Sequence, residues 1–254
     1  MLGVPREDRH LLSPWAVAIL GGLEADLAPA QRDDAALAVD NFKDYLRWLI
    51  AERQKNPLSG EDGEVLSKLV GPDAEGDTLT ELELLHNCIF LLNAGHETTA
   101  NTVTNGVDAL LRFPDQLDRL RADPELIVSG VEELLRFESS VQLNNRKLTA
   151  DAEIGGVAMN KGDYVWLCIG AANRDPAEFP DPDAIDIGRD RNKHLAFGSG
   201  IHACAGMSLG RMEIRIALNG FVQRFGQIEP SGTALHHPRA RFRGFVDYPV
   251  TASV

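Results

Sequence analysis

The residue with the most evident chemistry in this chain is Cys204, within the glycine-rich segment FGSGIHACAG at 197–206. Glycines tolerate backbone angles that other residues avoid, and a helix is expected to follow over 205–225. Backbone amides at a helix start favour a negative charge, so the segment should stabilise the thiolate, which is the form of cysteine that binds metals. The alternative is that Cys204 is a small buried apolar side chain, the commoner fate of a lone cysteine.

A zinc site is a second interpretation of the same region, because His194 and His202 lie close to Cys204 in sequence. No fourth ligand with the usual spacing follows. The chain has three cysteines, and Cys88 and Cys168 lie far from Cys204 without a C-x-x-C pair. The spacing therefore argues against both a disulfide framework and a cysteine-rich zinc site.

Two further motifs precede the cysteine segment. Glu133 and Arg136 stand at i and i+3 of an expected helix over 124–137, where they can form an ion pair. An exposed pair of this kind contributes at most about 1 kcal/mol, so alone it is weak evidence of function. The segment AGHETT at 94–99 lies within another expected helix, over 80–112, and its glycine and threonines are poor helix formers.

In this order, the three motifs resemble those of the cytochrome P-450 family, the haem-thiolate monooxygenases. The resemblance implies that haem b, iron protoporphyrin IX, is bound with Cys204 as the metal ligand, and that the thiolate promotes cleavage of the O–O bond. It also implies that Phe197 packs beside the sulfur and that His202 and Arg146 bind the haem propionates. The alternatives are a surface histidine and a strand-edge arginine. The cofactor-binding residues implied are Arg146, His194, Phe197, His202, Cys204 and Gly206, with His194 equally interpretable as a structural donor.

The resemblance assigns catalytic roles to Glu97 and Thr98. Thr98 would bond the carbonyl of Ala94 and open the helix, while Glu97 would relay protons. The alternative is an ordinary helix interior with a solvent-facing acid. Glu133, Arg136 and Arg189 are implied to be structural. The substrate-pocket residues implied are Phe90, Ala94, Val141, Asn144 and Phe242.

The expected fold class is mainly α with a small β region (α+β), as the C-terminal haem-binding part of the cytochrome P-450 fold. Residues 1–254 are expected to form a single, N-terminally truncated haem domain, because roughly the first third of a usual family member has no counterpart here. Expected helices are 33–53, 64–70, 80–112, 115–121, 124–137 and 205–225, with a small sheet over 146–172 and irregular coil over 173–189.

Composition narrows the partners. A formal net charge of -13 disfavours nucleic acid, which requires a strongly basic surface. The longest nearly apolar stretch, 88–94, is far shorter than the roughly 20 residues of a membrane span. The first residues do not resemble a secretion signal, so the cytoplasm is the expected location.

Two functions follow from these patterns. The first is a monooxygenase that inserts one oxygen atom from O2 into a small organic substrate, with electrons from a separate ferredoxin or flavoprotein. The second is a truncated, non-catalytic remnant or interaction module with weak or no haem binding. Because the helix over 80–112 is apolar on more than one face, self-association through surface exposed by truncation is also expected.

Overall fold

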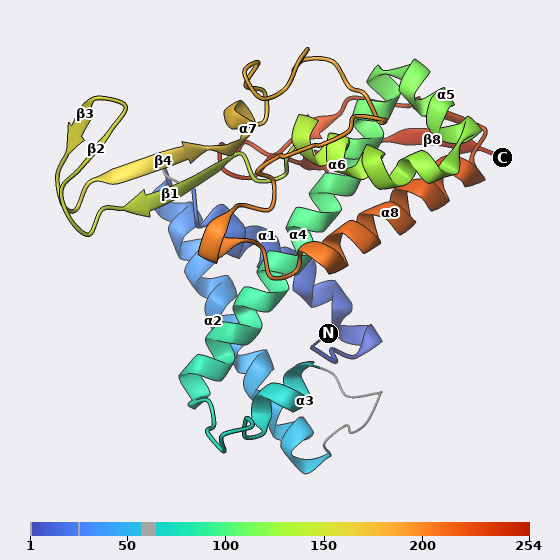
Figure 1. Cartoon of the computed structure of the whole chain (residues 1–254). Coiled ribbons are helices and arrows are strands. Elements are labelled where there is room, and N and C mark those ends of the chain that lie inside the picture. Colours follow the sequence, from blue (N-terminus) through green and yellow to red (C-terminus); the bar gives the residue numbers. More distant parts are fainter. Residues whose placement is uncertain (1, 25, 57–64) are drawn as a thin grey trace. The chain divides into compact units, whose positions relative to one another are not determined.

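The computed structural model describes residues 2–24, 26–56 and 65–254 (Figure 1). The chain forms two compact units, Met1–Glu97 and Thr98–Val254, which are described separately. The helix α4, Glu81–Arg112, begins in the first unit and ends in the second. It confirms the helix expected over 80–112.

The first unit is helical. Its elements are the 3-10 turn η1 (Arg6–Asp8), α1 (Arg9–Gly21), α2 (Pro29–Lys55), α3 (Val65–Val70) and the first part of α4. Trp15 of α1 stacks on Phe42 of α2 with 5.3 Å between ring centroids. The two helices approach so closely at Gly22 that a Cβ atom there would lie 2.6 Å from Ala35 Cβ.

The sequence placed α2, α3 and α4 within a few residues and did not predict α1. The helix expected over 33–53 begins earlier, at Pro29, since proline suits the first helical position. The expected 64–70 helix is found as α3, and Glu64 lies outside the described residues. The start of α4 has the expected capping box, in which Thr80 N donates to Glu83 Oε2 (2.9 Å) and Glu83 N donates to Thr80 Oγ1 (3.3 Å).

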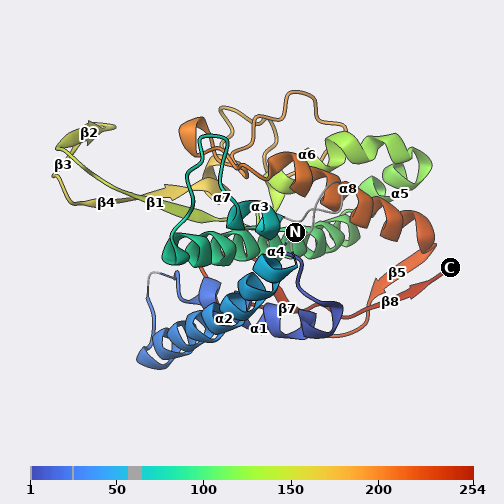
Figure 2. The same ribbon diagram turned by 90° about the horizontal axis from the view of Figure 1, so that it is seen from below.

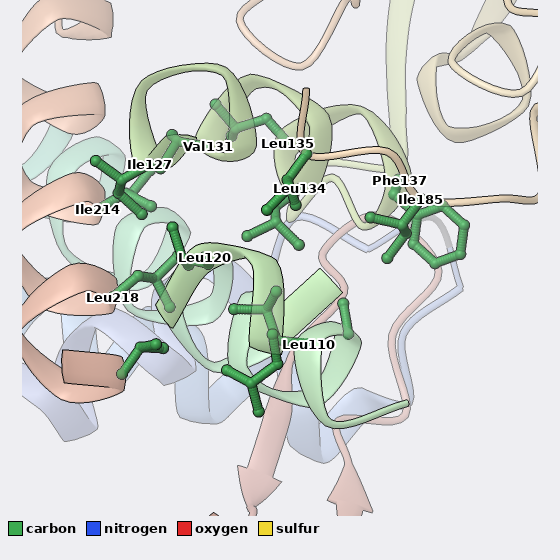
Figure 3. Close-up of a cluster of buried hydrophobic side chains, with 14 residues drawn as sticks. Leu110, Leu120, Ile127, Val131, Leu134, Leu135, Phe137, Ile185, Ile214 and Leu218 are labelled. Atoms are coloured by element: carbon green, nitrogen blue, oxygen red, sulfur yellow. The ribbon is translucent and has the colours of Figure 1, made fainter. Parts of the chain in front are cut away.

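The second unit has a helical core and four short ribbons. The rest of α4 packs with α5 (Pro114–Ala122), α6 (Ile127–Phe137) and α8 (Met207–Arg224). These helices supply most of the buried side chains of Figure 3, and Ile185 comes from the irregular coil. At Gly106 a Cβ atom would lie 3.0 Å from Leu218 Cδ1, so α4 and α8 are in close contact there. The helix expected over 124–137 is a 3-10 turn, η3 (Pro124–Leu126), followed by α6. Asp123 caps this turn by accepting a bond from Glu125 N.

The β structure is more divided than the small sheet expected over 146–172. Strand β1 (Leu143–Lys147) pairs with β4 (Tyr164–Cys168), and β2 (Ala152–Ile154) with β3 (Val157–Met159), both antiparallel. Gly155 and Gly156 turn between β2 and β3 with φ of 58° and 80°. The helical turn α7 (Ile169–Ala172) follows β4, where the strand was expected to continue.

Two more ribbons near the C-terminus were missed. Strand β5 (Gln227–Pro230) pairs with β8 (Val250–Ser253), and β6 (Leu235–His236) with β7 (Phe245–Asp247). Figure 2 shows β5 and β8 side by side beyond the C-terminal end of α8. Each strand is too short to show an alternating pattern. The fold class, mainly α with a small β region, is confirmed.

Candidate functional site

Arg136 is the most completely bonded side chain of the second unit. Its Nε donates to Glu133 Oε2 (2.8 Å) and its Nη2 to Glu133 Oε1 (2.8 Å). The other three donors bond the carbonyls of Asn173 (3.0 Å), Pro182 (2.8 Å) and Ala184 (2.9 Å). All five guanidinium N–H groups are thus satisfied, although both the Arg136 and Glu133 side chains are 0% exposed. The pair is therefore a buried ion pair, not a surface bridge.

Glu133 also binds the irregular coil. Its Oε2 accepts from Arg189 Nε (3.0 Å) and Asn192 Nδ2 (2.9 Å), and its Oε1 accepts from Asp186 N (3.0 Å). Burial alone would raise the pKa of Glu133, but the bonds from Arg136 and from the Asp186 backbone lower it below its usual value. The structure brings Glu133, Arg136 and Arg189 together, and they fasten the coil to α6.

The cysteine segment is a tight loop. Gly198 and Gly200 have φ of 69° and 68°, which favours glycine at both positions. Cys204 N donates to Phe197 O (2.8 Å), and Ala203 N donates to Gly200 O (3.0 Å) in the 3-10 turn η4 (Gly200–His202). These bonds close the loop and fix the backbone at Cys204.

The Cys204 thiol is exposed just before α8, which begins at Met207, two residues later than expected. A Cβ atom at Gly206 would contact the sulfur at 4.0 Å, so Gly206 leaves space beside it. Because Cys204 is exposed, the alternative interpretation of it as a small buried apolar side chain is wrong. That description fits Cys88, where burial raises the thiol pKa to about 11.

A metal ion bound at Cys204 would need most of its other ligands from a source other than the side chains around it. Within the described ranges, no group of three or more His, Cys, Asp or Glu side chains is placed to hold a metal ion. This finding is against the zinc site considered for His194, His202 and Cys204. One exposed thiolate fits an iron whose other ligands come from a porphyrin.

The two residues assigned to the propionates are both exposed. His202 ends η4, two residues before Cys204, and Arg146 lies on β1, where its Nη1 donates to the carbonyl of Asn145 (2.8 Å). Each side chain has N–H groups that can donate hydrogen bonds to a carboxylate.

His194 is buried, and its environment includes residues that the sequence did not single out. Its Nε2 lies 3.1 Å from Glu132 Oε2, and Arg211 of α8 donates to both oxygens of the same carboxylate at 2.8–3.0 Å. Burial would raise the pKa of Glu132, yet the bonds from His194 and Arg211 lower it to about 2. The sequence signal for Glu132 was the pair of consecutive acids in VEELLR. The sequence interpretation selected only Glu133, because only Glu133 matches the E-x-x-R motif.

The residues assigned to catalysis lie on α4, which is α-helical throughout 94–99. Glu97 is 4% exposed, so it is not the solvent-facing acid of the alternative interpretation. Thr98 is partly buried, and its carbonyl accepts a bond from Thr102 Oγ1 (2.8 Å). Phe90 and Ala94 are exposed on the part of α4 that belongs to the first unit.

The remaining pocket candidates belong to the second unit. Val141 and Phe242 form an isolated antiparallel bridge, and Asn144 lies on β1. A cavity of about 460 Å³ lies beside them, and its lining includes four basic residues that the sequence interpretation did not select. The lining residues are Gln142, Leu143, Cys168, Ala171, His236, His237, Arg239, Ala240, Arg243 and Gly244.

Comparisons with known proteins agree with this arrangement. The family model described as cytochrome P450 matches residues 27–252. The biotin biosynthesis cytochrome P450 of Bacillus subtilis is 38% identical over 99% of this chain, and the vitamin D(3) 25-hydroxylase of Pseudonocardia autotrophica is 42% identical over 86%. A crystal structure of P450BioI in complex with an acyl carrier protein ligated to hexadec-9Z-enoic acid matches 99% of the chain with a TM-score of 0.92 and 39% identity.

The chain therefore belongs to the cytochrome P450 family. It spans 62% of the length of the Bacillus subtilis relative, 52% of the vitamin D(3) 25-hydroxylase and 64% of the P450BioI chain. Within residues 2–24, 26–56 and 65–254, no helix is both long and apolar enough to cross a membrane.

Proposed function

We propose that this chain is the haem-binding domain of a monooxygenase that inserts one oxygen atom from O2 into a small organic substrate. The observation that carries the proposal is the exposed Cys204 thiol, held by a closed loop as a single protein ligand. Haem b supplies the iron at which dioxygen is activated, and a thiolate ligand promotes that activation.

The roles of the surrounding residues are proposed from the family resemblance together with their positions. Cys204 would hold the iron, Gly206 leaves space beside the sulfur, and Phe197 is proposed to pack next to it. His202 and Arg146 would offer donors to the propionates. On α4, the buried Glu97 carboxylate would hold a proton and the Thr98 hydroxyl would pass it to the reacting oxygen. His194 is assigned to the protein side of the loop, because its partners are Glu132 and the Ala196 backbone.

The substrate is proposed to be a small organic molecule. The candidate contacts in the second unit are Val141, Asn144 and Phe242, and those that the family resemblance suggests in the first unit are Phe90 and Ala94. The cavity of about 460 Å³ is within the usual size range of small-molecule sites, but none of these five residues lines it. Relatives are named for varied substrates, including vitamin D(3), and the CYP109E1 structures contain corticosterone or testosterone. Electrons are proposed to come from a ferredoxin or flavoprotein, and the cytoplasmic location remains a prediction.

The alternative, a non-catalytic remnant or interaction module that binds haem weakly, is favoured by one surface feature. Leu209, Met212 and Ile216, spaced along α8, are 37%, 52% and 68% exposed, which leaves an apolar stripe. Such stripes usually mark an interface, so we expect self-association. Sizing chromatography should show oligomers that Ile216→Glu converts to monomers; a monomeric wild-type chain would contradict this.

One spectrum tests the proposed function. The full chain is loaded with haem, reduced and exposed to carbon monoxide, and the red-shifted Soret band of a thiolate-ligated haem is expected. Cys204→Ser should abolish the band, because a serine hydroxyl stays protonated at neutral pH. Cys168→Ser is the matched control, since Cys168 is also exposed, and it should leave the band unchanged. No thiolate-type band in the wild-type chain would favour the remnant.

A further inference from the structure

Glu132 links three segments of the second unit through one carboxylate. It lies on α6, it accepts two Nε contacts and one Nη2 bond from Arg211 of α8, and it faces Nε2 of His194 in the coil that leads to the cysteine loop. Nη2 of Arg215, one turn along α8, lies 3.5 Å from the same carboxylate. When two donors of one guanidinium bond the same carboxylate, they fix the relative orientation of the two groups as well as the distance between them.

The hydrogen bonds of His194 define its tautomer. The backbone N–H of Ala196 donates to Nδ1 (3.1 Å), so Nδ1 is an acceptor and carries no hydrogen. The hydrogen is therefore on Nε2, which donates to Glu132. The His194 side chain is 2% exposed, so water cannot readily replace either partner. Glu132 thus orients a ring that in turn holds the backbone at Ala196.

Arg211 reaches the same loop through the Phe197 ring. Its guanidinium carbon lies 4.7 Å from the centroid of the Phe197 ring, a distance at which a cation and an aromatic face attract. Phe197 follows Ala196 directly. The contacts of Glu132 with His194 and with Arg211 therefore both lead to Ala196–Phe197. The Phe197 carbonyl accepts a hydrogen bond from the Cys204 backbone N–H.

We propose that Glu132 is a positioning residue, which holds the backbone at Ala196 through His194 and the Phe197 ring through Arg211, and so fixes the place of the Cys204 sulfur. The inference rests on the proposed function, in which this sulfur binds haem iron. It differs from the role of Glu133, whose bonds go to Arg136, Arg189, Asn192 and Asp186 and not to the loop.

Hydrogen–deuterium exchange of the full, haem-free chain tests the anchoring without relying on haem. Glu132→Gln replaces one acceptor oxygen with an amide N–H2, which faces the donors of His194 and Arg211. We expect the amides of residues 196–204 to exchange about tenfold faster, while β5 and β8 keep their wild-type rates. Arg211→Lys, which loses the planar fork but keeps the charge, should give a smaller increase in the same segment.

Glu125→Gln is the matched control, because Glu125 is exposed just before α6 and the change in charge is identical. It should leave exchange unchanged. Selective loop opening in Glu132→Gln supports the proposal. Unchanged loop exchange overturns it, and so does equal acceleration over the whole second unit in both Glu132→Gln and Arg211→Lys, which would make Glu132 a general stability residue.

The haem-loaded chain gives a second readout. In Glu132→Gln we expect the reduced carbon monoxide complex to lose its thiolate-type band several-fold faster than wild type, because a loose loop releases the sulfur more readily. A wild-type chain that never shows this band, together with selective loop opening in the variant, would refute the proposed function and leave the anchoring intact. Equal rates of band loss in variant and wild type would overturn the positioning role.

Discussion

Glu132 and Glu133 are consecutive acids on α6, and they differ in what they hold. Glu133 is 0% exposed and bonds an arginine of its own helix and the coil, whereas Glu132 is 20% exposed and bonds α8 and the start of the cysteine loop. Neighbouring helical residues point about 100° apart, so one helix serves two different segments. We therefore propose that fold stability and the placement of Cys204 depend on separate carboxylates.

The largest expected effect is that of Arg136→Ala. Removing Arg136 leaves Glu133 buried and charged without its main partner, which should lower the free energy of unfolding by about 3–5 kcal/mol. Urea titration followed by circular dichroism measures it. If Arg136→Ala unfolds at the wild-type urea concentration, the Glu133 cluster has no structural role and the contrast with Glu132 fails.

Acid should weaken both carboxylate clusters. The folded-state pKa of Glu132 is about 2 against an ordinary 4.5, so its contribution is complete above pH 4.5 and is lost as pH falls toward 2. Linkage gives about 3 kcal/mol for this loss, measurable by urea titration at several pH values. The curve of unfolding free energy against pH should fall less steeply in Glu132→Gln. The remaining fall is the part due to Glu133, whose pKa is also lowered. A curve identical to wild type would remove Glu132 from the acid response.

Arg189→Ala should have the smallest effect. Glu133 keeps Arg136, Asn192 and the Asp186 amide, so we expect a loss of about 1–2 kcal/mol. Arg119→Ala is the control, because its pair with Asp186 is about half exposed on both sides and should contribute at most about 1 kcal/mol. Equal losses in thermal unfolding would show that Arg189 is no more than a surface partner.

The sequence predicted the elements that depend on local signals. Thr80 and Glu83 marked the start of α4, Pro124 marked the start of the segment that contains η3 and α6, and glycines marked the turn at Gly155 and Gly156. These features are decided within a few residues by capping, missing N–H groups and backbone freedom. The cysteine segment was recognisable for the same reason, since its glycines and its ligand are contiguous.

The tertiary structure decided the features that join distant segments. Strands β5 and β8 pair Gln227 with Ser253, and no local sequence pattern predicts such a pairing. Glu132, His194 and Arg211 are spread over 80 positions, and no local pattern indicates that their side chains meet. The sequence by itself determined the family, singled out Cys204 and predicted most of the helices, although not α1. Only packing decided which of two adjacent glutamates is fully buried and which faces the cysteine loop, because burial depends on the segments that cover each side of the helix.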